Sequence, residues 1–317
     1  MRLDVKWANR QRLEYIEIMA YYTGIISRSE VAEAFGISDA AATKDLKLYN
    51  DLAPDNLIYK HSVFGFVPAA DFSEVFADLS PARILPMMAS NLAVAGGPYG
   101  DEAIYGIQLE ALPLPSRLPS KEVLAQITRA IRGHRKLQVS YHSLTDRDSI
   151  RQRILEPHSL VNAGLRWHVR AYNDETYDFR DFVLSRFVEA RSLDELAESN
   201  QQYDDDWVET INLKLSPHPK LDEQKRASLL LDFGVAGDAG DAGDAGDAGD
   251  AGDAGDAGDA GSDSNVIEIT VRRALVVYVL QRLTVDTSED QSMNPNAYQL
   301  VLLNREEIEP IAGWAFQ

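Results

Sequence analysis

The sequence contains no cysteine among its 317 residues. Disulfide frameworks, thiolate metal sites and cysteine nucleophiles are therefore excluded, and the composition suits a reducing compartment. The Gly-x-Ser-x-Gly nucleophile turn, the P-loop and the His-x-x-x-His metal pair are missing as well. Ser140 and His142 would share one face of a strand, with Asp146 or Asp148 nearby, but no oxyanion-stabilising turn accompanies them. We expect a protein that is not an enzyme and uses no cofactor or metal.

Long apolar segments are also missing. The longest uncharged run, residues 84–100, is broken by two prolines and by glycines, so it cannot form a continuous membrane-spanning helix. Charged side chains at Asp4, Lys6, Arg10 and Arg12 interrupt any signal-peptide core. We therefore expect a soluble, cytoplasmic protein without a membrane partner.

Positive charge is scarce overall, with 31 Lys and Arg against 50 Asp and Glu and a net charge of −19. Eight of the acids lie in the Ala-Gly-Asp repeat of residues 236–261, which leaves −19 + 8 = −11 for the rest. Residues 132–191 are different, because ten Arg and one Lys there exceed eight acids, a local +3. Arginine forks recognise planar anions such as phosphate, so this segment is a candidate anion-binding region.

Two segments mark domain boundaries. The repeat of residues 236–261 has no apolar side chain larger than Ala and repels itself, which predicts a disordered insertion. Three prolines within residues 112–119 predict an extended connector. We predict an α+β multidomain protein with domains at residues 1–110, 111–200 and 201–317.

The N-terminal segment shows three helical patterns and a hairpin. Leu13, Ile16 and Ala20 recur at helical spacing, and residues 27–30 have the capping-box form Ser-x-x-Glu. A Gly-Ile-Ser turn at 36–38 precedes a third helix that buries Ala42, Leu46 and Tyr49. Residues 57–60 and 64–67 are expected to pair as two strands. This order predicts a winged helix-turn-helix.

The third helix would expose hydroxyl and ammonium donors on its other side. "SRSEVAEAFGISDAAATKDLKLY" resembles the helix-turn-helix of bacterial winged-helix repressors. The resemblance implies a duplex DNA interface made by Arg10, Arg12, Arg28, Ser38, Thr43, Lys44, Lys47, Lys60 and His61. The alternative is a small helical domain whose lysines only face solvent. Residues 1–52 carry seven basic and eight acidic side chains, so binding depends on where the charge lies.

The middle segment predicts one helix and several short strands. Ser120 can cap a helix that ends at Gly133. Strands are expected at 137–141, 153–157, 160–161, 166–172 and 179–184. Short strands at this density favour a small curled sheet or barrel.

Four stretches of this segment, "LPLPSRLPSKEVLAQITRAIRGHRKLQVSYHS", "RILEPHSLV", "RWHVRAY" and "FRDFVLSR", resemble the WYL domain of bacterial transcriptional regulators. Trp167, His168 and Val169 stand where the family has Trp, Tyr and Leu, a form similar to the subgroup that controls phage-defence operons. The resemblance implies a small Sm/SH3-like β-barrel. It also implies a ligand pocket made by Ser140, Tyr141, His142, Arg153, His158, Trp167, His168, Arg180, Phe182 and Arg186.

Such a pocket suits a phosphate-bearing nucleotide or oligonucleotide, because arginines clamp phosphate and aromatic faces stack on bases. The alternative is structural. Trp167, Val169 and Phe182 would then be core residues, and the arginines would pair with Asp174, Asp178, Asp181 and Glu189 on the surface.

The C-terminal segment alternates strand and helix patterns, with strands at 210–215, 266–271 and 298–303 and helices near 222–230 and 273–283. This order predicts a small mixed α/β domain. It is similar to the extension that follows WYL domains and holds two subunits together in that family.

These observations predict a homodimeric transcription regulator, most simply a repressor of a phage-defence operon. It would bind an inverted repeat through two winged helices and be released by a phosphate-bearing ligand at the WYL domain. The alternative is an accessory nucleic-acid-binding module whose arginine-rich domain is the main binding surface.

Overall fold

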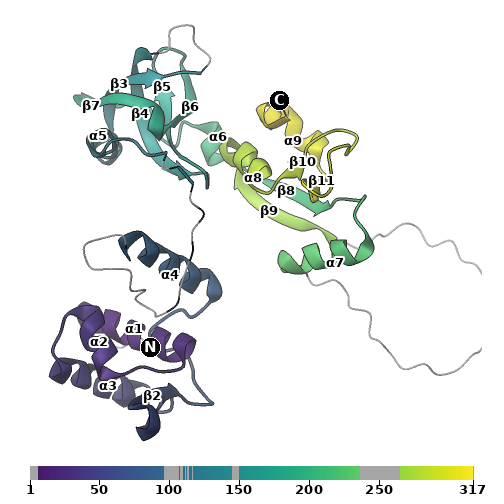
Figure 1. Ribbon diagram of the computed structural model, residues 1–317. Helices are drawn as coiled ribbons and strands as arrows, with labels where there is room; N and C mark the ends of the chain where they lie inside the picture. Colours follow the sequence, from purple (N-terminus) through teal and green to yellow (C-terminus); the bar gives the residue numbers. More distant parts are fainter. Residues whose placement is uncertain are drawn as a thin grey trace, which may run out of the picture. The chain divides into compact units, whose positions relative to one another are not determined.

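The computed structural model describes residues 6–95, 117–144, 150–235 and 265–316, with single residues 107, 110, 112, 114 and 115. The chain divides into two compact units, Met1–Pro115 and Ser116–Gln317 (Figure 1). The Ala-Gly-Asp repeat, and Asp146 and Asp148, which were considered beside Ser140 and His142, lie outside the described residues. Within the described part, no helix is both long and apolar enough to span a membrane.

The first unit is a winged helix-turn-helix followed by one more helix. Its elements are α1 (Trp7–Thr23), α2 (Arg28–Phe35), α3 (Asp39–Leu52), β1 (Leu57–Lys60), the 3-10 turn η1 (His61–Val63), β2 (Gly65–Pro68) and α4 (Pro81–Ala95). Leu13, Ile16, Val31 and Tyr49 are fully buried between the helices. The predicted core face of each helix is therefore confirmed.

A buried carboxylate fastens the segment after the hairpin to this core. Glu17 of α1 is fully buried and accepts backbone N–H bonds from Val75, Phe76 and Ala77 at 2.6–2.9 Å. The Tyr49 hydroxyl donates a further bond at 3.1 Å. These four donors replace the water that a buried carboxylate loses.

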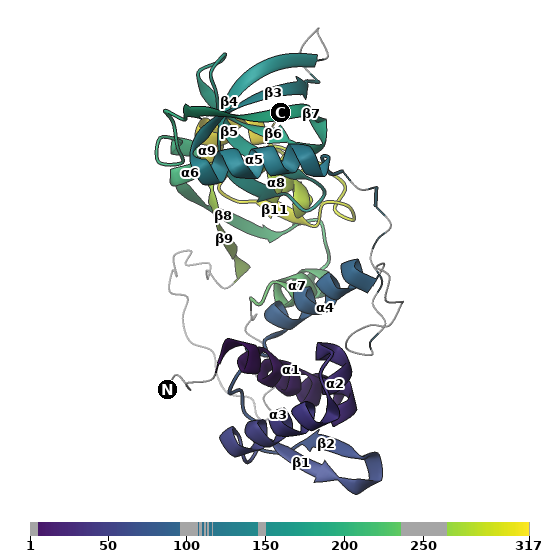
Figure 2. The ribbon, with the colours of Figure 1, turned by 90° about the vertical axis from the view of Figure 1, so that its left-hand side faces the viewer.

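The second unit begins with the WYL segment. Its elements are α5 (Lys121–Gly133), β3 (Arg135–His142), β4 (Ile150–Asn162), β5 (Trp167–Asn173), β6 (Asp178–Val183), η2 (Leu184–Arg186) and β7 (Phe187–Leu196). The strands form one antiparallel sheet in the order β6-β5-β4-β3-β7, and α5 lies across it (Figure 2). Ile127, Leu137, Leu155 and Val169 form the core between them.

The sheet differs from the prediction in three ways. Residues 150–162 form one strand instead of two, because a bulge at His158 lets the chain pass Pro157 without losing the pairing to β5. Strand β7 was not predicted, because its sequence FVEARSLDEL carries too many charges to show a clear alternation. The predicted closed barrel is not found among the described residues, where β6 and β7 are the two edges.

The rest of the second unit is a mixed α/β domain, as predicted. Its elements are α6 (Asp205–Val208), β8 (Thr210–Pro217), α7 (Glu223–Asp232), β9 (Ile267–Arg272), η4 (Arg273–Leu275), α8 (Val276–Arg282), β10 (Val285–Asp286), β11 (Leu300–Leu302), α9 (Arg305–Ala312) and η5 (Gly313–Phe316). The sheet order is β10-β11-β8-β9, around a core that includes Leu213, Leu215 and Leu280. Helices α6 and α9 and strand β10 were not predicted, since each is short.

Candidate nucleic-acid interface and effector site

Local hydrogen bonds orient the third helix of the winged-helix unit. The predicted capping box is present: Glu30 N–H donates to the Ser27 hydroxyl at 3.3 Å, and Ser27 N–H donates to the Glu30 carboxylate at 2.7 Å. Gly36 ends α2 in the left-handed region, with φ of 60°, and Ser38 caps α3 by accepting the Ala41 N–H. This geometry turns the chain sharply between α2 and α3.

The outward face of α3 carries the cations predicted to reach DNA. Thr43, Lys44 and Lys47 are exposed, opposite the buried Leu46 and Tyr49. Among the described residues, no acidic side chain forms an ion pair with Lys44 or Lys47. The Thr43 hydroxyl donates to the Asp39 carbonyl at 2.7 Å and retains its acceptor lone pairs. Two uncompensated ammonium groups therefore project from one helix face.

A groove separates α3 from the hairpin. Its volume is about 660 Å³, and it is lined by Ser27, Arg28, Ser29, Thr43, Leu46, Lys47, Asn50, Tyr59, Phe64 and Phe66. The side-chain oxygen of Asn50 is buried there without a hydrogen-bond partner among the described residues. Lys60 and His61 lie exposed at the end of β1, with the His61 ring 5.0 Å from that of Tyr59.

The three arginines predicted to flank the DNA have acidic partners. Arg12 is held by Asp45 in a two-point contact at 2.7 and 3.2 Å, with only 20% of its side chain exposed. Arg10 pairs with Glu14 at 3.0 Å, and Arg28 lies 3.7 Å from Asp39 at an exposed position. Arg12 therefore joins α1 to α3, whereas the side chains of Arg10 and Arg28 remain largely in solvent.

The predicted WYL pocket residues do not gather at one place. Tyr141 and Phe182 lie in the core, where the Tyr141 hydroxyl accepts the Val183 N–H at 3.1 Å. Arg153 is buried on the same face of the sheet, because it pairs with Val139 across the strands. Trp167 is 38% exposed, so the expectation that it is a core residue is wrong, whereas Val169 and Phe182 are buried as that alternative required.

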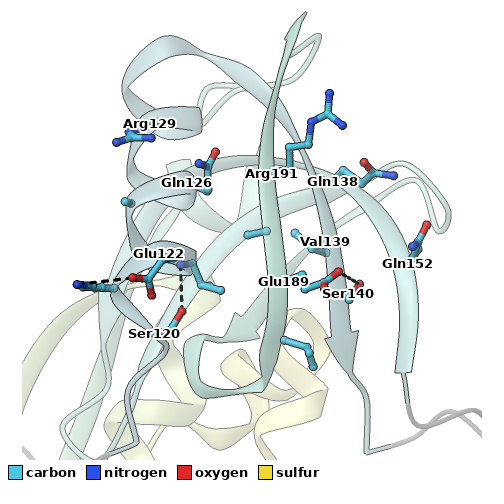
Figure 3. Close-up of a pocket in the computed structure, with 15 residues that line it drawn as sticks. Ser120, Glu122, Gln126, Arg129, Gln138, Val139, Ser140, Gln152, Glu189 and Arg191 are labelled. Carbon is cyan, nitrogen blue, oxygen red and sulfur yellow. Dashed lines mark hydrogen bonds and ion pairs between the residues drawn. The ribbon is translucent and has the colours of Figure 1, made fainter.

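Ser140 opens onto a groove of about 840 Å³ between α5 and strands β3 and β7 (Figure 3). Its hydroxyl points toward the Glu189 carboxylate and donates to it at 3.4 Å. His142 lies exposed at the end of β3. Arg180 pairs with Asp178 at 2.7 Å on the surface, as the structural alternative proposed for the arginines.

His168 lies at a different place, on the face of the sheet opposite the core residue Val169, where the charge of Arg186 acts on it. His168 is 1% exposed, and its Nδ1 atom has no hydrogen-bond partner among the described residues. Its ring lies 4.8 Å from the ring of Tyr278 on α8. Burial first, and then the positive charges of Arg166, Arg186 and Arg117, together lower the pKa of His168 from 6.5 to about 4.

We call His168 with Arg117, Arg166 and Arg186 the arginine–histidine cluster. The three guanidinium groups act electrostatically on the neutral imidazole, so this region carries positive charge and nitrogen donors of the kind that bind phosphate. Sequence reasoning missed Arg117, Arg166 and Tyr278. The first two belong to the arginine-rich stretch or its connector, but nothing in the sequence near Tyr278 connects it to His168.

A buried charge network lies beside this cluster. Arg170 is 5% exposed and binds Asp204 through two hydrogen bonds of 2.7 and 2.9 Å. It also lies 3.5 Å from Asp181, which accepts the Tyr278 hydroxyl at 2.9 Å. His158 contacts Asp204 at 3.2 Å. Burial raises the pKa of Asp204, but the bonds from Arg170 and His158 outweigh it and hold the pKa at about 2.

This network makes His158 a partner of Asp204 and connects the WYL sheet to two elements of the C-terminal domain, α6 and α8. Tyr278 contacts both His168 of the arginine–histidine cluster and Asp181 of the network. A ligand that moves Tyr278 would therefore disturb both.

Comparison with known families identifies the same three parts. Residues 8–90 match the BrxR transcriptional regulator winged helix-turn-helix domain, residues 122–192 match the WYL domain, and residues 258–308 match the BrxR transcriptional regulator C-terminal dimerization domain. A DNA-binding transcriptional repressor CapW of Pseudomonas aeruginosa is 30% identical over 313 residues, covering 98% of this chain and 94% of that protein. The chain belongs to the CapW family.

Other CapW repressors show the same end-to-end similarity. That of Escherichia coli strain KTE188 is 31% identical and covers 97% of this chain and 93% of its own length. The CapW repressor of Stenotrophomonas maltophilia is 27% identical, and the match covers 96% of this chain and 92% of that protein. Among solved structures, Proteasome accessory factor B/C of Arthrobacter aurescens aligns at 17% identity and a TM-score of 0.24, and this chain spans 48% of its length.

Proposed function

We propose that this chain is a homodimeric, DNA-binding transcriptional repressor that recognises an inverted repeat through two copies of α3. The observation that carries the proposal is the exposed α3 face, on which Lys44 and Lys47 lack acidic partners among the described residues. Membership of the CapW family supports it. A two-fold dimer would place half-sites about 10 bp apart or a multiple of that.

The same proposal places domain boundaries near residues 110 and 200. It assigns dimerisation to the C-terminal part, which the matched dimerization domain supports. The operon under control would be one of phage defence, an expectation that rests on the sequence resemblance of the WYL segment.

A mobility-shift titration tests DNA binding. The duplex is one that the full-length wild-type protein selects from a random-sequence pool, and binding is measured at several salt concentrations. Lys44→Ala/Lys47→Ala should weaken binding at least tenfold and reduce the salt slope by about two, because each phosphate contact contributes about 0.9. Lys121→Ala, on an exposed lysine beside Glu122, is the matched control and should change neither quantity.

Release would follow when a phosphate-bearing nucleotide or oligonucleotide fills the arginine–histidine cluster. The buried Nδ1 of His168 and the positive charges of the three arginines that act on it support this location. Such a ligand releases DNA only if it binds the DNA-incompetent arrangement more tightly.

A 5′-phosphorylated tetrathymidylate and inorganic pyrophosphate are suitable probes of this site. Each is added to the protein–DNA complex, and binding to the free protein is measured by calorimetry. Arg166→Ala/Arg186→Ala should abolish probe binding and spare DNA binding, whereas Arg180→Ala, whose partner is Asp178, should spare both. If the arginine pair abolishes duplex binding and the lysine pair does not, the arginine-rich surface is the main nucleic-acid site and the alternative function holds.

A further inference from the structure

The β1–β2 hairpin exposes apolar side chains instead of covering them. Ile58, Tyr59, Val63 and Phe64 are 51%, 45%, 46% and 80% exposed. The hairpin, residues 57–68, contains no acidic residue, and its tip carries Lys60 and His61. It projects from the helices of its unit (Figure 2). An exposed apolar tip without negative charge, at the edge of a cationic surface, fits a polyanionic partner that also offers apolar surface.

Phe64 has an unfavourable backbone as well as an exposed ring. Its φ is 52° and its ψ is 31°, in the left-handed region that bulky side chains rarely adopt. The next residue, Gly65, is needed for another purpose. A Cβ there would lie 3.0 Å from the Ile25 side chain and 3.1 Å from the Ile26 carbonyl oxygen.

The close approach at Gly65 allows Ile26 and Phe66 to exchange two backbone hydrogen bonds of 2.8 and 2.9 Å. These bonds fix the hairpin to the helices. Because the glycine is used for this close approach, the residue that adopts the left-handed conformation is Phe64. Neither this conformation nor the exposure of the ring stabilises the free protein. This combination favours a role for the ring in an intermolecular contact.

The Phe64 ring lies at the edge of the groove between α3 and the hairpin. Phe64 and Tyr59 line the same groove of about 660 Å³ as Thr43 and Lys47. If α3 lies in the DNA major groove, the adjacent sugar–phosphate strand would occupy the protein groove between α3 and the hairpin, close to Arg28 and Lys47. The hairpin tip would then meet the minor groove on the other side of that strand.

We propose that Phe64 is an apolar wedge that enters the DNA minor groove and packs on deoxyribose and base edges. This inference rests on the proposed binding of duplex DNA by α3. The contact releases no counterions, because Phe64 carries no charge. It widens the minor groove and bends the duplex toward the major groove. The operator would therefore favour flexible pyrimidine–purine steps at the wing, without hydrogen bonds to their bases.

The first test compares affinity, salt slope and bending for the full-length protein on the selected duplex. Phe64→Ala should bind about tenfold more weakly with an unchanged salt slope, and fluorescence transfer between the DNA ends should report a smaller bend. Lys60→Ala, the matched change of a charged neighbour, should reduce the salt slope by about one. Phe64→Trp should restore affinity and bending.

Folding of the variants is checked by thermal melting. Phe64→Gly should melt at or above the wild-type temperature, because glycine adopts a positive φ freely, while it binds DNA as weakly as Phe64→Ala. A loss of affinity in this variant cannot be attributed to unfolding.

The second test locates the contact. Replacing adenine by 2,6-diaminopurine adds an amino group in the minor groove and leaves the hydrogen-bonding atoms of the major-groove edge in place. Placed at the steps under the wing, it should weaken wild-type binding about tenfold and leave Phe64→Ala binding unchanged. Equal binding by Phe64→Ala and wild type, or insensitivity of the wild type to diaminopurine, would overturn the proposal.

Two outcomes distinguish a failure of the Phe64 wedge from a failure of the proposed DNA binding by α3. If Lys44→Ala/Lys47→Ala leaves duplex binding intact, DNA binding by α3 fails, and the wedge fails with it. If the lysine pair behaves as expected and Phe64→Ala instead changes the sedimentation mass of the free protein, the wing is a protein contact and the wedge alone is refuted.

Discussion

The winged-helix unit and the WYL sheet use their cations in opposite ways. In the first unit, the basic and acidic residues of positions 1–52 nearly balance, yet Lys44 and Lys47 project from α3 without acidic partners among the described residues. In the WYL segment arginine exceeds acid, yet Arg170 is buried between Asp204 and Asp181, and Arg180 is paired with Asp178. The number of cations in a segment therefore says little about where an anion binds. What matters is whether neighbouring acidic side chains already neutralise those cations.

The largest expected effect follows from the internal use of arginine. Arg170→Ala should lower the free energy of unfolding by about 3–5 kcal/mol, because it leaves Asp204 and Asp181 buried without their cation. Arg180→Ala should lower it by less than about 1 kcal/mol, because that pair is exposed. Urea unfolding followed by tryptophan fluorescence measures both. Equal losses would remove the distinction between internal and surface arginines.

Arg12 tests whether the first unit also has an internal cation. Its two-point contact with the buried Asp45 predicts that Arg12→Ala lowers the free energy of unfolding by about 2–3 kcal/mol. The salt slope of DNA binding should then be unchanged. A slope reduced by about one, with unaltered stability, would mean that Arg12 binds phosphate, as the sequence led us to expect.

His168 makes the stability of the second unit depend on pH. Its folded pKa of about 4 lies below the ordinary value of 6.5, so the unfolded chain binds the proton more readily. Its contribution to stability is complete above pH 6.5 and is lost as the pH falls toward 4. Between pH 6.5 and 5 the loss should be about 1.5 kcal/mol, because the slope rises to about 1.4 kcal/mol per pH unit only once the unfolded imidazole is fully protonated.

Unfolding measured against pH checks this prediction. His168→Phe should show a flatter decline than the wild type over that range, and His61→Ala, a change at the exposed wing tip, should follow the wild type. A bound anion favours the imidazolium, so pyrophosphate should raise the pKa of His168 as followed by NMR. An unchanged pKa at saturating pyrophosphate would contradict the proposed anion site.

A smaller effect than that of the buried charges is expected at Tyr278. Tyr278→Phe removes the 2.9 Å hydrogen bond to Asp181 and should cost about 1.5 kcal/mol in unfolding free energy. The ring stays beside His168, so probe binding should persist. Tyr278→Ala, which removes the ring, is the comparison. If both variants respond to the probe as the wild type does, Tyr278 takes no part in transmitting occupancy.

Local structure was predictable where the signal lies within one element. The capping box at Ser27, the left-handed turn at Gly36 and the caps at Ser38 and Ser120 follow from side-chain and backbone preferences over three or four residues. The exposed side of α3 followed from its helical period in the same way.

The candidate effector site was only partly predictable. His168 and Arg186 were named from the resemblance, and the charge of Arg186 acts on His168, whereas Tyr141 and Phe182 face the core and Ser140 opens onto another groove. The alternating faces of strands would have separated Tyr141 from its neighbours in sequence. The bulge at His158 could not be read from the pattern, because it changes which face the following residues occupy.

The sequence by itself determined the helix-helix-helix-hairpin order of the first unit, the helix caps and the placement of two lysines on one helix face, because these depend on contacts within a few residues. Only the tertiary structure decided which arginines are neutralised, why His168 is buried and neutral, and that Tyr278 lies against it. Those properties depend on side chains that are distant in sequence, such as Asp204 and Tyr278, and burial changes both the strength of a charge interaction and the state of an ionisable group.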